Sequence, residues 1–116
     1  MQKEIIMYSR TAGCPFVTLA KRVLNDYAVP FREVLIDQDE IARERVRAWT
    51  GFLAVPTLVI TNCNEVLPFI EPLTLSTGSS PRGINRGTMI TEPNIAQLTE
   101  WLQQHGFVAA ADLERE

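Results

Sequence analysis

The two cysteines are the residues of this sequence best suited to covalent chemistry, and they lie far apart, at Cys14 and Cys63. Cys14 stands directly before Pro15, at the start of a segment with helical spacing. Proline favours the first turn of a helix, so we expect Cys14 to be the N-cap or a first-turn residue. There the helix dipole and the basic side chains of Arg10 and Lys21 favour the thiolate, which is the form that attacks a disulfide. Cys14 is therefore a candidate nucleophile, and a buried structural cysteine is the alternative.

The dipeptide Val55-Pro56 is a second signal, because it directly precedes the β-branched run at residues 57–60. Proline donates no hydrogen bond to a strand ladder, so it belongs at the start or the edge of a strand. A trans bond is the simpler reading from the residues alone, since cis peptide bonds are rare.

The elements that would position these residues alternate between strands and helices. Hydrophobic runs predict strands at 4–8, 31–36 and 57–60, with one amphipathic helix from Pro15. Asp37 and Asp39 signal the start of a second helix, which runs to Thr50 and Gly51. Strands that alternate with helices are typical of parallel βαβ units, so the sequence predicts an α/β fold.

Residues 62–86 break this rhythm, because they are rich in glycine, proline and asparagine. We interpret them as an extended insertion. Apolar side chains such as Phe69 and Leu73 indicate that the insertion folds back on the domain or on a partner. Its arginines, Arg82 and Arg86, are expected near an anion-binding rim, although a plain flexible loop is the commoner outcome.

The chain after the insertion predicts one more strand and helix. Residues 88–90 form the strand, Thr91 the N-cap and Pro93 the first turn, and Gly106 ends the helix. The C-terminal tail spans 107–116, and its residues 109–116 have no core pattern of their own.

Composition narrows the possible functions. The chain has 116 residues, of which 46% are hydrophobic and 22% charged, which is ordinary for one globular domain spanning 1–116. A net charge of -3 argues against nucleic-acid binding. The apolar run at residues 5–7 is too short for a signal peptide or a membrane span, and two cysteines are too few for a secreted disulfide framework. We therefore expect a cytoplasmic protein that binds neither nucleic acid nor a membrane.

Metal chemistry has little support in the sequence. A single histidine and two distant cysteines cannot supply the four ligands of a closed zinc site. We therefore predict no metal site.

Four motifs in this order resemble the glutaredoxin branch of the thioredoxin superfamily, and most of all its bacterial mycoredoxin-like members. They are Tyr-Ser-Arg (8–10), Cys-Pro-Phe-Val (14–17), Ala-Lys-Arg-Val-Leu (20–24) and Val-Pro-Thr (55–57). The resemblance covers residues 3–61 and resumes at 87–93, whereas residues 62–86 have no counterpart in it.

The resemblance implies a thioredoxin fold, in which three helices flank a four-stranded mixed sheet, here with the insertion before the last strand and helix. It implies that Cys14 is the nucleophile and faces Pro56 in a cis peptide, and that the backbone of Val55 pairs with an extended thiol peptide such as glutathione. Arg10 would hold a substrate carboxylate, and the turn at Thr91 would receive the other end of the ligand. The substrate-binding set implied in this way is Arg10, Gly13, Pro15, Phe16, Val55, Pro56 and Thr91.

Val17 departs from the dithiol members of the family, because it takes the position of their second cysteine. Cys63 is a poor replacement. Seven residues of extended strand at about 3.3 Å each place it roughly 20 Å from Pro56. A disulfide requires Cα atoms within about 7 Å of each other. We therefore expect a single redox-active cysteine.

These observations predict a monothiol glutaredoxin-like oxidoreductase that reduces mixed disulfides between proteins and a low-molecular-weight thiol. Glutathione or another small thiol would be the co-substrate, with no tightly bound cofactor. The partners would be disulfide-containing proteins or small molecules, and the protein a monomer or weak dimer. The alternatives are an arsenate-reductase-like thiol reductase and a redox-inactive thiol-binding or iron-sulfur scaffold module. The sequence Cys-Pro-Phe-Val differs from the Cys-Gly-Phe-Ser of cluster-binding relatives.

Overall fold

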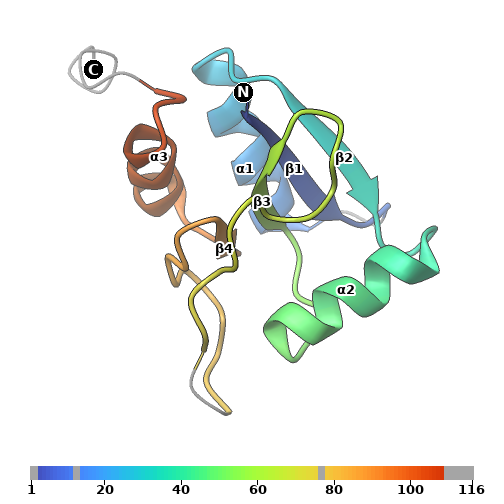
Figure 1. Ribbon diagram of the computed structural model, residues 1–116. Helices are drawn as coiled ribbons and strands as arrows, with labels where there is room; N and C mark the ends of the chain where they lie inside the picture. The colour runs from blue at the N-terminus through green and yellow to red at the C-terminus, as the bar shows by residue number, and fades with distance from the viewer. Residues whose placement is uncertain (1–2, 12–13, 76–77, 109–116) are drawn as a thin grey trace.

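The computed structural model describes residues 3–11, 14–75 and 78–108 (Figure 1). The elements in chain order are β1 (Lys3–Ser9), α1 (Pro15–Asp26), β2 (Phe31–Leu35), α2 (Glu40–Thr50), β3 (Thr57–Asn62), β4 (Met89–Thr91) and α3 (Ile95–Gln104). The sheet order is β2-β1-β3-β4, with β1 parallel to β2 and β3 antiparallel to both of its neighbours. The predicted mixed four-stranded sheet with three helices, a thioredoxin fold, is confirmed.

The core is built around the two central strands, because β1 and β3 are hydrogen-bonded on both sides. Residues 5–8 of β1 and 57–61 of β3 are buried. Such continuous apolar strands are expected where both faces of a sheet are covered. Helices α1 and α3 contact each other, and α2 lies apart from them at the lower right of Figure 1. None of the helices among the described residues is long and apolar enough to cross a membrane.

The first two helices begin as predicted. Cys14 is the N-cap of α1, followed by Pro15 at the first helical position. The carboxylate of Asp39 accepts a hydrogen bond from the backbone N–H of Ala42 and so caps α2. Gly51 ends α2 with a φ of 78°, a left-handed conformation that glycine adopts without strain.

The start of α3 differs from the prediction. Thr91 is the last residue of β4 rather than an N-cap, because it pairs with Thr57 of β3. The N-cap is Asn94, which forms a capping box with Gln97. Pro93 consequently precedes the helix instead of lying in its first turn.

The insertion folds back on the domain. Its first half follows β3, since the backbone N–H of Phe69 donates to the carbonyl of Ile60 and the Tyr8 hydroxyl donates to the carbonyl of Val66. Its second half runs beside β4, where Arg82 and Asn85 form isolated bridges. The described residues on either side of 76–77 extend away from the sheet (Figure 1).

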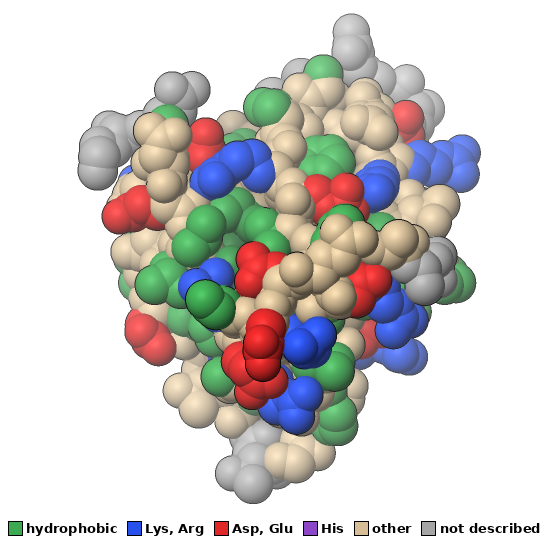
Figure 2. All heavy atoms as spheres, turned by 90° about the vertical axis from the view of Figure 1, so that its right-hand side faces the viewer, with side chains coloured by type: hydrophobic (Ala, Val, Ile, Leu, Met, Phe, Trp, Pro, Cys, Tyr) green, Lys and Arg blue, Asp and Glu red, His purple; other side chains and the backbone are tan. Residues whose placement is uncertain are grey.

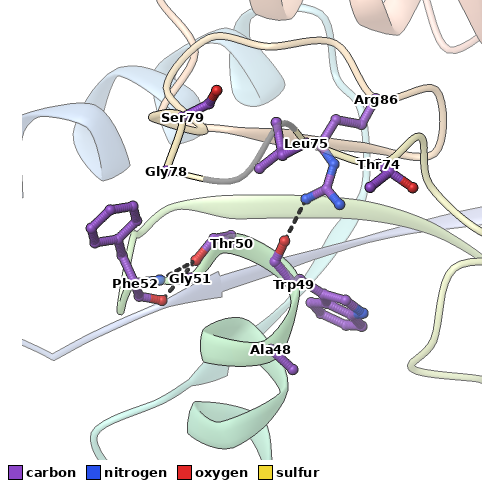
Figure 3. A pocket seen from close by; sticks show the side chains of 10 residues that line it. All are labelled: Ala48, Trp49, Thr50, Gly51, Phe52, Thr74, Leu75, Gly78, Ser79 and Arg86. Carbon is purple, nitrogen blue, oxygen red and sulfur yellow. Dashed lines mark hydrogen bonds between the residues drawn. The ribbon is translucent and has the colours of Figure 1, made fainter.

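Arg86 locks this insertion to α2, and its predicted place on an anion-binding rim is wrong. The residue is only 7% exposed. Its Nε donates to the carbonyl of Leu73 at 2.7 Å. An Nη donates to the carbonyl of Trp49, also at 2.7 Å (Figure 3). Burial lowers the pKa of the guanidinium from its ordinary value. Arg86 therefore satisfies backbone carbonyls instead of presenting donors to a ligand.

A cavity of about 340 Å³ lies between the end of α2 and the insertion (Figure 3). Trp49, Phe52 and Leu75 are among the residues that line it, together with Arg86.

Candidate functional site

The sulfur of Cys14 lies at the amino end of α1. Its backbone is extended, with φ -138° and ψ 128°, and its carbonyl accepts the helical hydrogen bond from Thr18. The side chain makes no capping hydrogen bond, so the sulfur is not tied to its own helix. The residue is half-buried, and its Sγ lies 3.7 Å from the carbonyl oxygen of Val55. The prediction that Cys14 is the N-cap is confirmed.

Val55 and Pro56 form the wall opposite the sulfur. The peptide bond between them is cis, as the family resemblance implied and in contrast to the simpler trans reading. Both residues are buried. The carbonyl of Pro56 accepts a 2.8 Å hydrogen bond from the backbone N–H of Glu92, which follows β4. Three segments far apart in the sequence therefore meet around one thiol.

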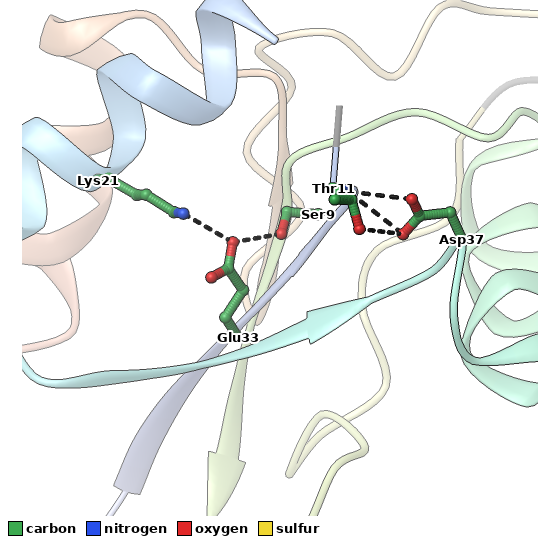
Figure 4. Close-up of polar contacts among 5 residues, drawn as sticks. All are labelled: Ser9, Thr11, Lys21, Glu33 and Asp37. Carbon is green, nitrogen blue, oxygen red and sulfur yellow. Dashed lines mark hydrogen bonds and ion pairs between the residues drawn. The ribbon is translucent and has the colours of Figure 1, made fainter. Parts of the chain in front are cut away.

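Polar contacts hold the segment that leads from β1 toward Cys14 (Figure 4). The backbone N–H of Thr11 donates to both carboxylate oxygens of Asp37, at 3.2 and 3.1 Å, and its hydroxyl donates to the same carboxylate. Asp37 lies in the turn between β2 and α2. Thr11, which follows β1, is thereby fixed to the turn between β2 and α2.

Glu33 makes a second set of contacts at this end of the sheet (Figure 4). Its Oε2 accepts a hydrogen bond from the Ser9 hydroxyl and lies 3.0 Å from Nζ of Lys21 in α1. Burial alone raises the pKa of the Glu33 carboxyl, but the Ser9 hydrogen bond and the Lys21 ammonium outweigh it, so the pKa is below its ordinary value. Glu33 thus links β1, β2 and α1. Sequence reasoning missed Glu33 and Asp37 because both lie in ordinary-looking charged segments.

Arg82 reaches the rim of the Cys14 site from the insertion. Its Nη2 lies 3.2 Å from Oε2 of Glu92, and its Cζ lies 5.0 Å from the centre of the Phe16 ring. Phe16 is two residues beyond Cys14. Glu92 places a negative charge at this rim, and its ion pair with Arg82 offsets that charge.

The structure brings together most of the predicted site residues. Cys14, Pro15 and Phe16 form the helix start, and the Thr91 hydroxyl lies 3.0 Å from the hydroxyl of Thr57, the residue directly after Pro56. Gly13 lies outside the described residues. Arg10 is exposed on the segment after β1. The binding roles assigned to all of these residues remain predictions.

Val17 and Cys63 lie in different environments, and a single active thiol remains a prediction. Val17 is 7% exposed and belongs to the hydrophobic core. Cys63 is exposed just after β3, where its Sγ lies 3.7 Å from the carboxylate of Glu4. Six residues of β3 separate the Pro56 end from Cys63, a span of about 20 Å. The two cysteines therefore occupy opposite ends of the sheet.

The described part of the chain contains no group of three histidine, cysteine or acidic side chains placed to hold a metal ion. This observation concerns those ligand types alone.

Comparison with known proteins identifies one family. The glutaredoxin family model matches residues 5–63, a little over half of the chain, from within β1 to just beyond β3. The match includes Cys14, Val55 and Pro56 and ends before the insertion and β4. A search of curated proteins found no match to the sequence.

Proposed function

The chain belongs to the glutaredoxin family, which supports a thiol-disulfide oxidoreductase function, and we propose that it reduces mixed disulfides by a monothiol route through Cys14. The substrates are disulfides between a protein or small molecule and a low-molecular-weight thiol. Glutathione or a similar thiol is the co-substrate, and the protein works as a monomer or weak dimer.

The reaction has two exchange steps. The Cys14 thiolate attacks the small-thiol sulfur of the mixed disulfide, so that a Cys14–small-thiol disulfide forms and the substrate thiolate leaves. A second small-thiol thiolate then attacks the sulfur carried by Cys14. This step releases the symmetrical small-thiol disulfide and restores the Cys14 thiolate. In the net reaction the substrate sulfur is reduced to a thiol and one small thiol from solution is oxidised, while the small-thiol sulfur of the mixed disulfide stays at the disulfide level.

The observation that carries the proposal is the placement of Sγ of Cys14, 3.7 Å from the Val55 carbonyl and at the amino end of a helix. The Val55 backbone beside the sulfur is suited to pairing with an extended peptide-like thiol. Val17 cannot resolve a disulfide, so the second thiol must come from solution.

The arsenate-reductase-like alternative has less support. It needs several arginine donors directed into an anion pocket, and the guanidinium of Arg86 donates instead to protein carbonyls.

Turnover of a glutathionylated peptide in the presence of glutathione and a glutathione-recycling system tests the proposal. We expect Cys14→Ser to lower the rate by at least about 100-fold, because the nucleophile is lost. Cys63→Ser is the matched control and should keep the rate within about two-fold, since its thiol is at the other end of the sheet. A loss of turnover in Cys63→Ser would contradict the monothiol route.

A further inference from the structure

We propose that Arg82 is a specificity-determining residue, which binds a carboxylate of the disulfide that Cys14 attacks while Phe16 and Glu92 hold its guanidinium in place. The inference rests on the proposed function of Cys14. It assigns a role to the insertion, which lies beyond the part of the chain that the family model matches.

The backbone fixes Arg82 to the active end of the sheet. Arg82 bridges Thr91, and the N–H of the next residue, Gly83, donates to the Thr91 carbonyl at 2.7 Å. Thr91 in turn pairs with Thr57, directly after Pro56. Arg82 is therefore tied through two strands to the wall that faces the sulfur.

Phe16 and Glu92 orient the side chain of Arg82 but leave most of it exposed to solvent. Its guanidinium lies over the Phe16 ring, an arrangement that orients the planar group. One nitrogen, Nη2, contacts Glu92. The side chain is nevertheless 61% exposed. A guanidinium has five N–H donors in a fixed fork, so donors remain for a second carboxylate.

Arg86, in the same insertion, has a guanidinium that is not available to a ligand. Its donors are directed at the carbonyls of Leu73 and Trp49, and the residue is buried. The two arginines lie four residues apart, but only Arg82 combines an exposed guanidinium with a place beside the helix that Cys14 caps.

Glu92 sets how strongly this rim attracts anions. Its side chain is 16% exposed. The Glu92 carboxylate competes with an incoming carboxylate for the guanidinium of Arg82. Removing the Glu92 charge should therefore raise the preference for anionic over neutral disulfides. Removing the Arg82 charge should lower that preference. The opposite directions expected for the two variants distinguish a charge effect from general damage to the site.

Two aromatic disulfides of similar size and different charge test the inference in the Cys63→Ser background. Dithiobis(nitrobenzoate) carries two carboxylates, and dithiodipyridine is uncharged. In each case the Cys14 thiolate forms a mixed disulfide with one aryl thiol and releases the other, which is coloured. The ratio of the two second-order rate constants, measured at low ionic strength, reports charge preference, because any change in the nucleophile itself affects both reagents.

We expect Arg82→Gln to lower the anionic-to-neutral ratio by about five-fold or more, and Glu92→Gln to raise it about two-fold or more. The control is Arg32→Gln, which removes an arginine from a comparable exposed pair, Arg32 with Glu4, toward the other end of the sheet. This control should change the ratio by less than about 1.5-fold, since screening weakens charges beyond about 10 Å.

Equal ratios in Arg82→Gln and its parent, or an equal change in the Arg32→Gln control, would overturn the inference. Failure of the proposed function has a different signature. In that case Cys14 of the parent would react with the uncharged reagent no faster than free glutathione does, whatever the ratios in the variants.

Discussion

The two ends of the sheet carry similar residues, yet only one end has the geometry of a reactive thiol. At one end Cys14 lies near an arginine–glutamate pair, Arg82 with Glu92. At the other end Cys63 lies beside Glu4, which pairs with Arg32 at 2.8 Å. Residue types alone would not separate these two ends.

The difference lies in what the backbone presents to each sulfur. Cys14 caps a helix and is 3.7 Å from a backbone carbonyl beside a proline. Cys63 follows a strand instead, and its Sγ lies beside the carboxylate of Glu4. A carboxylate next to the sulfur repels a negatively charged small-thiol reactant. Surface charge is no better guide, since Figure 2 shows acidic and basic side chains interspersed on the face that carries β2 and α2. The two sulfurs therefore differ in what the backbone places beside them, and the proposal that Cys14 is the nucleophile rests on this difference.

The largest expected effect comes from giving the Cys14 end a second thiol. Val17 lies three residues after Cys14, and residues three apart on a helix have Cβ atoms about 5 to 6 Å apart, near the range of a disulfide. In the Cys63→Ser background, Val17→Cys should form an intramolecular disulfide on oxidation and gain reduction of insulin, a dithiol reaction. Thiol counting and the insulin turbidity assay measure the two results.

The parent chain is the control for that variant. It should form no intramolecular disulfide between Cys14 and Cys63, because the strand between them spans about 20 Å. Such a disulfide in the parent would remove the distinction between the two ends.

The next effect concerns stability, because Arg86 fixes the insertion to the rest of the Cys14 end. Arg86→Met should lower the free energy of unfolding by about 2 to 4 kcal/mol, since Arg86 is buried and two backbone carbonyls lose a charged donor. Urea denaturation measures the loss. Arg32→Met removes an exposed ion pair and should cost less than about 1 kcal/mol. Equal losses in both variants would show that Arg86 is not a structural lock.

Much of the fold followed from the sequence, because it rests on local signals. Hydrophobic runs marked the first three strands to within two residues of their observed ends. The Cys14-Pro15 pair located the start of α1, and Asp39 and Gly51 bounded α2. These signals work because capping and burial depend on nearby residues.

The remaining features depend on contacts between distant segments, which local patterns do not encode. Thr91 and Asn94 are both good N-cap residues, and pairing of Thr91 with Thr57 decides in favour of Asn94. Arg82 and Arg86 likewise looked equivalent. Only the path of the insertion buries Arg86 and brings Arg82 to Phe16.

The smallest expected effect is on stability, from removal of the Glu33 charge. The Glu33 carboxylate accepts a hydrogen bond from Ser9 and pairs with Lys21 at the Cys14 end of the sheet. Its pKa is below the ordinary value of 4.5, so ionised Glu33 stabilises the folded state above that value. The contribution disappears as the pH falls through the lower pKa of the folded state. Glu33→Gln should therefore lower the free energy of unfolding by less than about 1 kcal/mol at neutral pH, because the pair is partly exposed to solvent.

The same variant should approach the parent as the pH falls through the folded-state pKa of Glu33, because the parent's carboxyl then loses its charge as well. Urea midpoints measured in steps from about pH 7 into the acid range follow this convergence. Glu71→Gln, at an exposed position of the insertion, is the matched control and should differ little from the parent across this range. A Glu33→Gln deficit that stayed constant across this range would mean that shape, rather than the charge that Ser9 and Lys21 stabilise, accounts for the role of Glu33.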